Sequence, residues 1–476
     1  MIAGELHIDS NFSLIIFARV RYAVDADDIA YFASTMKRKN KTLKIFFKRT
    51  LLLITLSIYN VATIAAERAS VVVGATHGLC IEDASCINRL HPSIPMTHRV
   101  KPGQTILFHT RDAVDVLGTI AAQRGDTEES EVLRASILDK SRFYDMDNNF
   151  AHPMAGPVYI EGAEPGDVLK VTIISIDPGE YGYTFGSGGF IRDLMEGQFL
   201  AIWRLNKEFA VSDDIPGVRI PNASFPGIVS TLPGPDQLQT ILHREQQLAD
   251  AGGQVMLPVS NKATPSAICG PDGSASNECL RTVPPREHGG NMDIRYLQSG
   301  SSVYLPCFIE GCGLTIGDLH YAQGDGEVSG TAIEMSADIL ISTELLSNGP
   351  DLAYGPHYEG VSRFLDIPSE RFYAVTGIPV KKEGDVPPHM DYLDSRVLGL
   401  LGNVSNDITI AARNALDGMI NYIVATYGYN SNQALVIASV AVDLRITQLV
   451  DAPNVGVTAV LPLDIFVGEA GEPKSP

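Results

Sequence analysis

The sequence has too little positive charge, and too few glycine and proline residues, for two common classes of protein. Among its 476 residues, 36 are Lys or Arg and 56 are Asp or Glu, so the formal net charge is -20. A protein that binds nucleic acid needs clustered basic side chains against phosphate, and this charge balance argues against that class. The 43 Gly and 28 Pro residues are too few and too scattered for a disordered chain. We therefore expect most of the chain to fold, with no nucleic-acid partner.

Hydrophobic runs of membrane length are also missing. The run that comes nearest, residues 51–66 (LLLITLSIYNVATIAA), has 16 residues and contains Asn60. A helix that spans a bilayer needs ~20 apolar residues. Residues 1–66 hold nine basic and five acidic residues, a net charge of +4, whereas the rest of the chain carries -24. We expect no stable membrane span in the mature chain, and a retained anchor is the weaker alternative.

The start of the chain has the layout of a secretory signal peptide. Seven basic residues between Met36 and Arg49 precede the apolar run, which ends in small residues. This layout predicts cleavage near Ala65 or Ala66 and export to the periplasm or outside the cell. Residues 1–35 would then precede the working start at Met36.

Cysteine is scarce, and its spacing excludes a metal knuckle. The six cysteines form three close pairs, and none has the short spacing of a structural zinc site. An oxidising compartment permits disulfides, so we expect the first two pairs, which flank loop-like residues, to be bridged. The third pair lies in a predicted strand and its continuation, where two buried thiols are the alternative. The pairs are Cys80 with Cys86, Cys269 with Cys279, and Cys307 with Cys312.

Alternation of apolar and polar residues predicts a mainly β protein. In the stretch EPGDVLKVTI, residues 164–173, apolar side chains alternate with Lys170 and Thr172 after a Pro-Gly turn. This period of two is typical of a half-buried strand, and KPGQTILFH at 101–109 follows the same plan. We expect the α+β class: an antiparallel β-sandwich or barrel-like core, a few packed helices and a C-terminal α/β element.

Helical spacing is confined to a few segments. Residues 119–142 indicate a loop or short helix, and residues 235–250 predict an amphipathic helix. Asp407 is a candidate N-cap for a further helix, and a second one follows from Ser431. The segments 442–450 and 455–463 are expected to be strands. The predicted regions are an N-terminal extension at 1–66, β-rich regions at 67–235 and 236–400, the latter with the active site, and C-terminal helices and strands at 401–476.

Residues 286–335 hold the densest set of polar side chains with adjacent glycines. Three pairs of polar residues are spaced i, i+2, and on an extended chain each pair projects to one side of the backbone. Acidic turns in an acidic chain are often only solvated, but three such pairs within 37 residues favour a functional site. One imidazole with several carboxylate and amide oxygens suits a divalent ion that keeps a position open for water. The pairs are Asn291 with Asp293, Asp318 with His320, and Asp325 with Glu327.

Two residues earlier in the chain are candidates for the same pocket. Asp112 ends the strand-like stretch TILFHTRD, and His152 begins HPMAGPVYIEGAEPGD. Either side chain could face the pocket from a neighbouring strand.

Four motifs together resemble the acetamidase/formamidase family, whose members hydrolyse linear amides. They are HPMAGPVYIEGAEPGDVL (152–169), PPREHGGNMD (284–293), GDLHYAQGDGEVSGTAIEM (317–335) and, more loosely, VDLRITQLVDAPNVGVTAVLP (442–462). The resemblance covers about residues 90–465. It implies a β-rich core with a C-terminal α/β element and a divalent metal at the site. The residues that it carries over are Asn291, Asp293, His320, Asp325 and Glu327, together with Asp112 and His152.

The chemistry of amide hydrolysis gives these residues their expected roles. A metal ion polarises the carbonyl group and lowers the pKa of a bound water to about 7, and a carboxylate relays the water's proton to the leaving nitrogen. We expect Zn²⁺, with Ca²⁺ as the alternative. The expected ligands are His320, Asp318 and Asp293, with Asp112 and His152 as further candidates. The expected catalytic residues are Glu327 as general acid and base, Asn291 as orienter or oxyanion donor, and Asp325.

Three other readings of the sequence remain open. A serine amidase could use a Ser in SGSSV (299–303) or in FGSGGF (185–190), and a cysteine amidase could use Cys307 or Cys312. An exported β-rich binding protein could hold Ca²⁺ in its acidic loops for stability alone. The amide's substituent and the oligomeric state, a homo-oligomer included, stay open as well.

Overall fold

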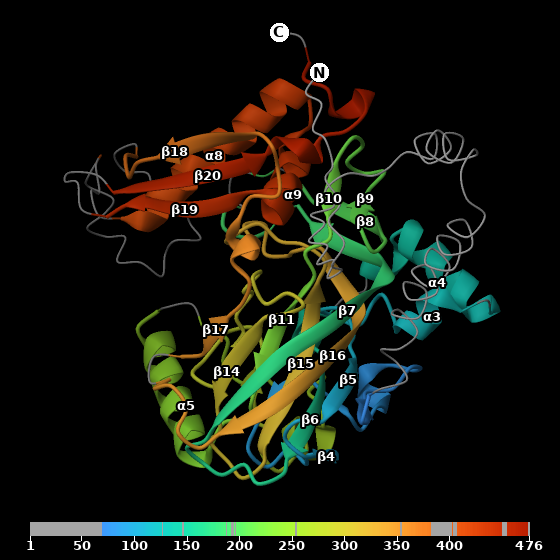
Figure 1. The fold of residues 1–476 in the computed structure, drawn as a ribbon, viewed down its shortest axis with the longest axis vertical. Coiled ribbons are helices and arrows are strands. Elements are labelled where there is room, and N and C mark those ends of the chain that lie inside the picture. Colours follow the sequence, from blue (N-terminus) through green and yellow to red (C-terminus); the bar gives the residue numbers. More distant parts are fainter. Residues whose placement is uncertain are drawn as a thin grey trace, which may run out of the picture. The chain divides into compact units, whose positions relative to one another are not determined.

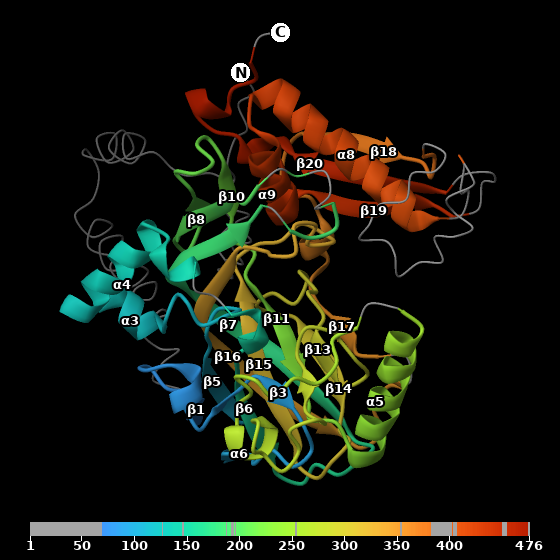
Figure 2. The same cartoon turned by 180° about the vertical axis from the view of Figure 1, so that it is seen from behind.

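The structure is a computed structural model, seen from two opposite sides in Figures 1 and 2. The chain divides into two units, Met1–Ala65 and Ala66–Pro476. The signal-peptide prediction lies outside the described residues, none of whose helices is long and apolar enough to cross a bilayer. The structure describes residues 69–381 apart from 126, 145–146, 187, 192–194, 196, 253–254 and 353–354, together with 402, 407–449 and 455–474.

The unit Ala66–Pro476 is built on a 15-stranded sheet in which most neighbours are antiparallel. Strands from the predicted regions 67–235 and 236–400 both belong to this sheet. Its strands are β1 (Val71–Val73), β2 (Cys86–Ile87), β4 (His98–Val100), β5 (Thr105–His109), β6 (Met154–Ile160), β7 (Val168–Phe185), β8 (Leu200–Leu205), β9 (Phe209–Val211), β10 (Arg219–Pro221), β11 (Phe225–Ser230), β13 (Gly289–Asn291), β14 (Ser302–Pro306), β15 (Cys312–His320), β16 (Glu334–Leu346) and β17 (His357–Glu359).

Two long strands, β7 and β16, pair along almost their whole length, and the sheet branches from them (Figure 1). The other edge of β16 pairs first with β15 and then with β5. β15 in turn pairs with β11 and β6, so two runs of strands join where β15 meets β16. The described strands form an open, branched sheet and no closed barrel. The prediction of a mainly β, antiparallel core is confirmed.

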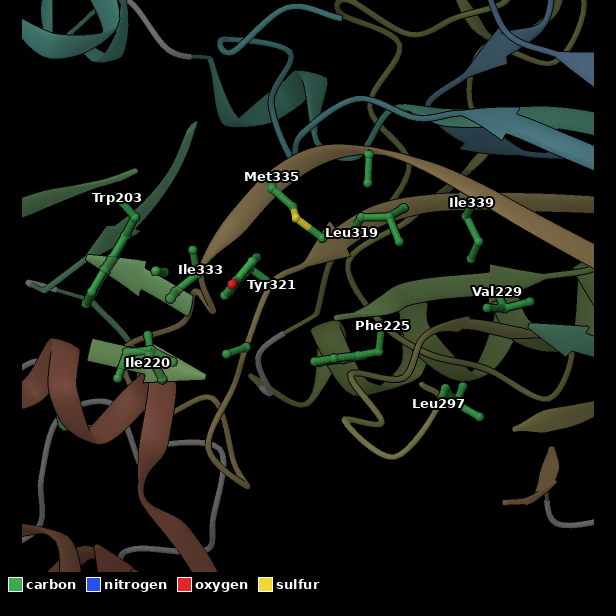
Figure 3. Packing of buried hydrophobic residues seen from close by; sticks show 14 of the residues in the cluster. Trp203, Ile220, Phe225, Val229, Leu297, Leu319, Tyr321, Ile333, Met335 and Ile339 are labelled. Atoms are coloured by element: carbon green, nitrogen blue, oxygen red, sulfur yellow. The ribbon is translucent and has the colours of Figure 1, made fainter. Parts of the chain in front are cut away.

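Alternation in the sequence explains which side chains fill the core. In β7, Leu169, Val171 and Ile173 are buried, while Lys170 and Thr172 between them are only partly covered. Burying one face of each strand in this way is the main stabilising contribution in such a sheet. Figure 3 shows the packing around the junction of β15 and β16, with Leu319, Tyr321, Ile333 and Met335 among the labelled side chains.

Helices cover the ends and edges of this core. The predicted helix at 235–250 is confirmed as α5, which begins with Pro235 at its first turn and buries Leu238 and Ile241. The stretch 119–142 contains two helices, the second longer than expected because Thr127 caps it by accepting from the backbone N–H of Ser130. The α-helices are α3 (Ile120–Arg124), α4 (Glu128–Leu138), α5 (Pro235–Asp250), α6 (Ser266–Cys269), α8 (Ile408–Tyr427) and α9 (Ser431–Ala441). Short 3-10 turns include η7 (Ser362–Leu365) and η9 (Leu463–Ile465).

The C-terminal α/β element is confirmed. Its strands β18 (Phe372–Gly377), β20 (Gly456–Pro462) and β19 (Asp443–Gln448) form an antiparallel sheet in that order, and α8 packs against it (Figure 2). Asp407 caps α8 as predicted, because its carboxylate accepts from the first free backbone N–H groups of the helix. No individual strand was predicted for the residues that form β18. A further pair, β3 (Arg89–Leu90) and β12 (Leu280–Arg281), forms a small separate sheet.

All three cysteine pairs are disulfides. The two expected bridges, Cys80–Cys86 and Cys269–Cys279, are confirmed. The third pair, Cys307–Cys312, is bridged as well, so neither sulfur is a free thiol. Nucleophilic catalysis needs a thiolate, and the cysteine-amidase reading is therefore contradicted.

Candidate metal centre

The site lies where β15 meets β16. The register of this antiparallel pair sets His320, the last residue of β15, opposite Glu334, the first residue of β16. Asp318 comes two residues before His320 on β15. Only 1–3% of each of these three residues is exposed. The junction therefore buries one imidazole and two carboxyl groups together, at a point where the flanking side chains are apolar.

A third carboxyl group arrives from the segment that follows β13. β11 pairs with β13 on one edge and with β15 on the other, so it lies between them. The carbonyl oxygen of Gly227 in β11 accepts from the backbone N–H of Met292 at 3.0 Å and of Asp293 at 3.3 Å. These bonds hold Asp293 beside the junction, close to His320.

Gly227 leaves just enough room for this arrangement. A Cβ atom at residue 227 would lie 2.8 Å from His320 Cε1 and 2.9 Å from Asp293 Oδ1, both closer than Cβ contacts normally allow. We expect Gly227→Ala to lower the free energy of unfolding by about 1–3 kcal/mol through overpacking. Chemical denaturation measures it. Gly456→Ala is the matched control, because the nearest atom to a Cβ there is 3.5 Å away; equal losses in both variants would contradict this account.

Two groups of side chains among the described residues have the geometry to hold a metal ion. Both groups include His320, and within each group one ligand atom per residue lies within 4.8 Å of the others. His320 Nε2 lies 3.6 Å from Asp318 Oδ2 and 3.3 Å from Glu334 Oε2. The groups are Asp293, Asp318 and His320, and His320, Glu327 and Glu334.

Buried polar atoms without hydrogen-bond partners gather at this point. A buried donor or acceptor that lacks a partner is costly, so a cluster of them in one place points to a missing partner such as an ion. Oxygen and imidazole nitrogen donors together are the set that Zn²⁺ and other divalent ions accept. The donor set therefore fits the predicted divalent ion. The partnerless atoms are Asn291 Oδ1, Asp293 Oδ1, Asp318 Oδ1, His320 Nε2 and Glu334 Oε2.

Gln323 fixes which nitrogen of His320 faces the carboxyl groups. Its Nε2 donates to the carbonyl oxygen of Asp293 at 3.0 Å, and a carbonyl oxygen can only accept, so Oε1 must face His320 Nδ1, 3.0 Å away. Nδ1 therefore donates to Oε1, and Nε2 is left directed at Asp318 and Glu334. In a neutral imidazole this places the Nε2 lone pair on the carboxyl side, as a metal ligand requires.

The backbone is unusual at three of these positions. Asp293, Asp318 and Glu327 have φ angles of 50°, 53° and 44°, in the left-handed region that non-glycine residues seldom occupy. Seven described non-glycine residues have positive φ, so nearly half of them belong to this small cluster. Residues held in such conformations concentrate at functional sites, where surrounding structure imposes them.

Burial shifts the pKa values of the carboxyl groups in a consistent pattern. Loss of solvation raises the pKa of Asp293 to about 7 and that of Glu334 to about 7, and burial and then Asp293 raise that of Glu327 well above its usual value. Burial opposes ionisation of Asp318 too, but the nearby His152 and His320 outweigh it and hold its pKa below the usual value. Burial alone would lower the pKa of His320, but Glu334 and Asp318 raise it well above normal. So much buried negative charge calls for compensation by protons or by a cation.

Two more predicted residues lie at the edge of this cluster. Asn291 ends β13 and presents the partnerless Oδ1 described above. His152 Nε2 lies 4.0 Å from Asp318 Oδ2, while its Nδ1 lies 3.4 Å from the hydroxyl of Thr282. Burial lowers the pKa of His152, so this imidazole tends to be neutral.

Asp112 and Asp325 fall in neither group. The carboxylate of Asp112 accepts from backbone N–H groups of its own turn, at Val114, Val116 and Leu117, which explains its burial without a metal. Asp325 accepts from the hydroxyl group of Tyr296 at 2.8 Å. The structure thus gives both carboxylates a structural partner of their own.

The sequence interpretation missed two residues of the site. Glu334 and Gln323 stand inside the motif GDLHYAQGDGEVSGTAIEM but were not among the candidates. Glu334 lies between Ile333 and Met335, and a carboxyl group within an apolar strand is a signal for a buried functional residue. Gln323 gives no such signal, because its role depends on the position of Asp293.

Comparisons with known proteins agree with the resemblance seen in the motifs. The family model described as the Acetamidase/Formamidase family matches residues 75–468. A formamidase from Methylophilus methylotrophus is 32% identical over 402 residues, 81% of this chain and 90% of that protein. An acetamidase from Mycolicibacterium smegmatis is 33% identical over 384 residues, 74% of this chain and 84% of that protein.

One solved structure has the same fold. A gamma lactamase from Delftia acidovorans superposes with a TM-score of 0.70 and is 28% identical; the match covers 84% of this chain and 94% of the other. The match thus spans nearly all of that protein, as the formamidase match does. From motifs, fold and relatives alike, this chain belongs to the acetamidase/formamidase family and is an amidase.

Proposed function

We propose that this chain is a metal-dependent amidase of short linear amides such as formamide and acetamide. It would add water across the C–N bond and release a carboxylate and ammonia. The observation that carries the proposal is the convergence of one imidazole, two buried carboxyl groups and two partly buried ones, with several partnerless atoms, at the junction of β15 and β16. The names of the relatives, formamidase and acetamidase, support the choice of substrates.

Asp293, Asp318 and His320 are the proposed ligands. They form one of the two candidate groups, and Gln323 orients the imidazole so that Nε2 faces the carboxyl groups. A bound divalent ion, which we propose to be Zn²⁺, would polarise the substrate carbonyl and activate a water molecule. Three protein ligands would leave a coordination position for the reactants, as in catalytic zinc sites.

Glu327 and Asn291 are proposed to act on the reactants. Burial and the neighbouring Asp293 raise the pKa of Glu327, so its carboxyl group holds a proton readily. It would accept one proton from the attacking water as the C–O bond forms and pass it to the nitrogen as the C–N bond breaks. The amide of Asn291 would donate to the carbonyl oxygen. Glu334 is less free to move protons because its Oε1 accepts from the backbone N–H of Ala332 at 2.9 Å.

Removal of the metal tests this proposal. Exhaustive chelation of the purified chain is expected to abolish ammonia release from formamide and acetamide, and added Zn²⁺ is expected to restore it. Ammonia is measured with an enzyme-coupled assay before chelation, after it and after readdition. Full activity in protein shown by elemental analysis to be metal-free would rule out the metal-dependent mechanism.

The same experiment separates this function from its alternatives. A calcium-stabilised binding protein would release no ammonia from any amide and would only lose thermal stability on chelation. A cyclic amide is a second candidate substrate, because the relative of 28% identity is named a gamma lactamase. Hydrolysis of a γ-lactam opens the ring without releasing ammonia, so chromatographic detection of the amino acid identifies it.

Export of the protein is part of the proposal. Three disulfides within residues 80–312 support an oxidising compartment, as does the signal-like layout before Ala66. N-terminal sequencing of the secreted or periplasmic protein tests it: a mature start near residue 66 is expected, and an intact N-terminus on protein recovered only from the cytoplasm would contradict it.

A further inference from the structure

A cavity of about 130 Å³ lies next to the candidate metal centre. Gln323 belongs to both, because it lines the cavity while its side chain bonds to His320 Nδ1 and to the carbonyl of Asp293. Arg295, another lining residue, follows Asp293 by two positions. At ~30 Å³ of liquid per water molecule, this volume corresponds to about four waters, and so has room for a group larger than a methyl. The proposed mechanism uses none of this space.

Arg295 offers a hydrogen-bond donor that lacks an acceptor. Only 9% of the residue is exposed, and its Nη1 contacts the carboxylate of Asp443 on β19. Its Nε is buried and has no hydrogen-bond partner. A buried guanidinium donor without an acceptor is unfavourable, and Arg295 lines the cavity, so an acceptor oxygen of a ligand that reaches its guanidinium group would be stabilised.

The charges that line the cavity balance. Two arginines, Arg295 and Arg363, are matched by two acids, Asp366 and Asp443. The other polar lining side chains are uncharged amides, those of Asn222, Gln298 and Gln323. A cavity whose lining has no net charge and contains hydrogen-bond donors favours an uncharged ligand that accepts hydrogen bonds over an anion or a cation.

Building on the proposed amidase function, we propose that this cavity receives the acyl substituent of the substrate. The amide group to be hydrolysed lies at the metal centre, and the substituent extends past Gln323 toward Arg295. The preferred substituent carries an uncharged acceptor oxygen for the guanidinium group of Arg295. Succinamide, whose second amide group supplies that oxygen, represents this class of substrate.

Kinetic selectivity tests the cavity. Values of kcat/KM are measured for formamide, propionamide, succinamide and the anion succinamate. Arg295→Lys keeps the charge that pairs with Asp443 but removes the guanidinium donors, so the ratio of succinamide to propionamide is expected to fall about tenfold, which is the effect of one lost hydrogen bond. Ala441→Leu, which fills the cavity from the end of α9, is expected to lower the ratios of propionamide and succinamide to formamide.

Arg445→Lys is the matched control. Arg445 also pairs with Asp443, at 3.3 Å, but does not line the cavity, so the three ratios are expected to stay at the wild-type values. Unchanged ratios in both cavity variants, or a wild-type preference for succinamate over succinamide, would overturn the assignment. Thermal unfolding of each variant separates misfolding from a change in selectivity.

A binding measurement tests the cavity assignment independently of catalysis. Saturation-transfer NMR is expected to detect succinamide on the metal-stripped wild-type chain, and the signal is expected to disappear in Ala441→Leu. If the wild type hydrolyses no amide but this pattern holds, the amidase proposal fails and the cavity stands. If no binding is seen, or binding persists in the filled variant, the cavity assignment fails by itself.

Discussion

Asp318→Asn is expected to remove the bound metal and to lower amide hydrolysis by at least about a hundredfold. The substitution changes the carboxylate to an amide of nearly equal size, so it removes a charged ligand with little change in packing. Loss of residues that only support a metal ligand already costs 10- to 100-fold in affinity or activity, and loss of a ligand is expected to cost more. Metal content is measured by elemental analysis on the purified variant, and kcat/KM by ammonia release from formamide.

Asp338→Asn is the control for this variant. Asp338 also lies on the large sheet and also pairs with a histidine, because its Oδ1 lies 2.6 Å from His109 Nδ1, but neither residue belongs to the metal groups. The control is expected to keep its metal and its activity. A variant at Asp318 that binds a full equivalent of metal and hydrolyses formamide at the wild-type rate would refute the ligand assignment.

Local sequence patterns predicted the elements whose stability is local. The alternation at 169–173 lies in β7, because burial of one face of a strand shows within a few residues of sequence. Helix α5 begins at the predicted Pro235, because a proline favours the first turn of a helix. Strand β18 was not predicted. It pairs with β20, 80 to 90 residues further along the chain, and most of its side chains are exposed, so its own sequence shows little alternation. Its place is determined by a distant partner.

The same distinction explains which site residues could be predicted. Asp318 and His320 were found as a pair, and the structure brings them together. The pair of Asp325 and Glu327 separates, because the chain turns through Gly326 and Glu327 has a φ of 44°, so the rule that i and i+2 share a side no longer applies. Glu327 lies at the metal groups, while Asp325 bonds to Tyr296.

Glu334 depends on strand register, which the sequence does not contain. It faces His320 because β15 and β16 pair with a specific offset, and a shift of one residue would turn its side chain to the other side of the sheet. Register is set by the packing of the whole core around residues such as Leu319 and Met335. Glu334 lies within the family motif, but its position beside His320 follows only from the pairing of β15 with β16.

Glu327→Gln is expected to separate the chemical step from metal binding. The amide side chain cannot exchange a proton with water and the leaving nitrogen, so kcat for formamide is expected to fall by roughly 10² to 10⁴. Asp293, Asp318 and His320 are untouched, so a full equivalent of metal is expected to remain. Elemental analysis and steady-state kinetics on the same preparation measure the two quantities together.

Comparing Glu327→Gln with Glu334→Gln tests which of the two glutamates carries the proton. Glu334 Oε2 lies 3.3 Å from His320 Nε2, so the negative charge of this carboxylate also attracts a cation at that nitrogen, and its loss is expected to weaken metal binding as well as turnover. The two glutamates belong to the same candidate group, yet only one of them is expected to change kcat at full metal occupancy. If Glu327→Gln loses its metal while Glu334→Gln keeps it and loses turnover, the roles are reversed, and Glu334 carries the proton.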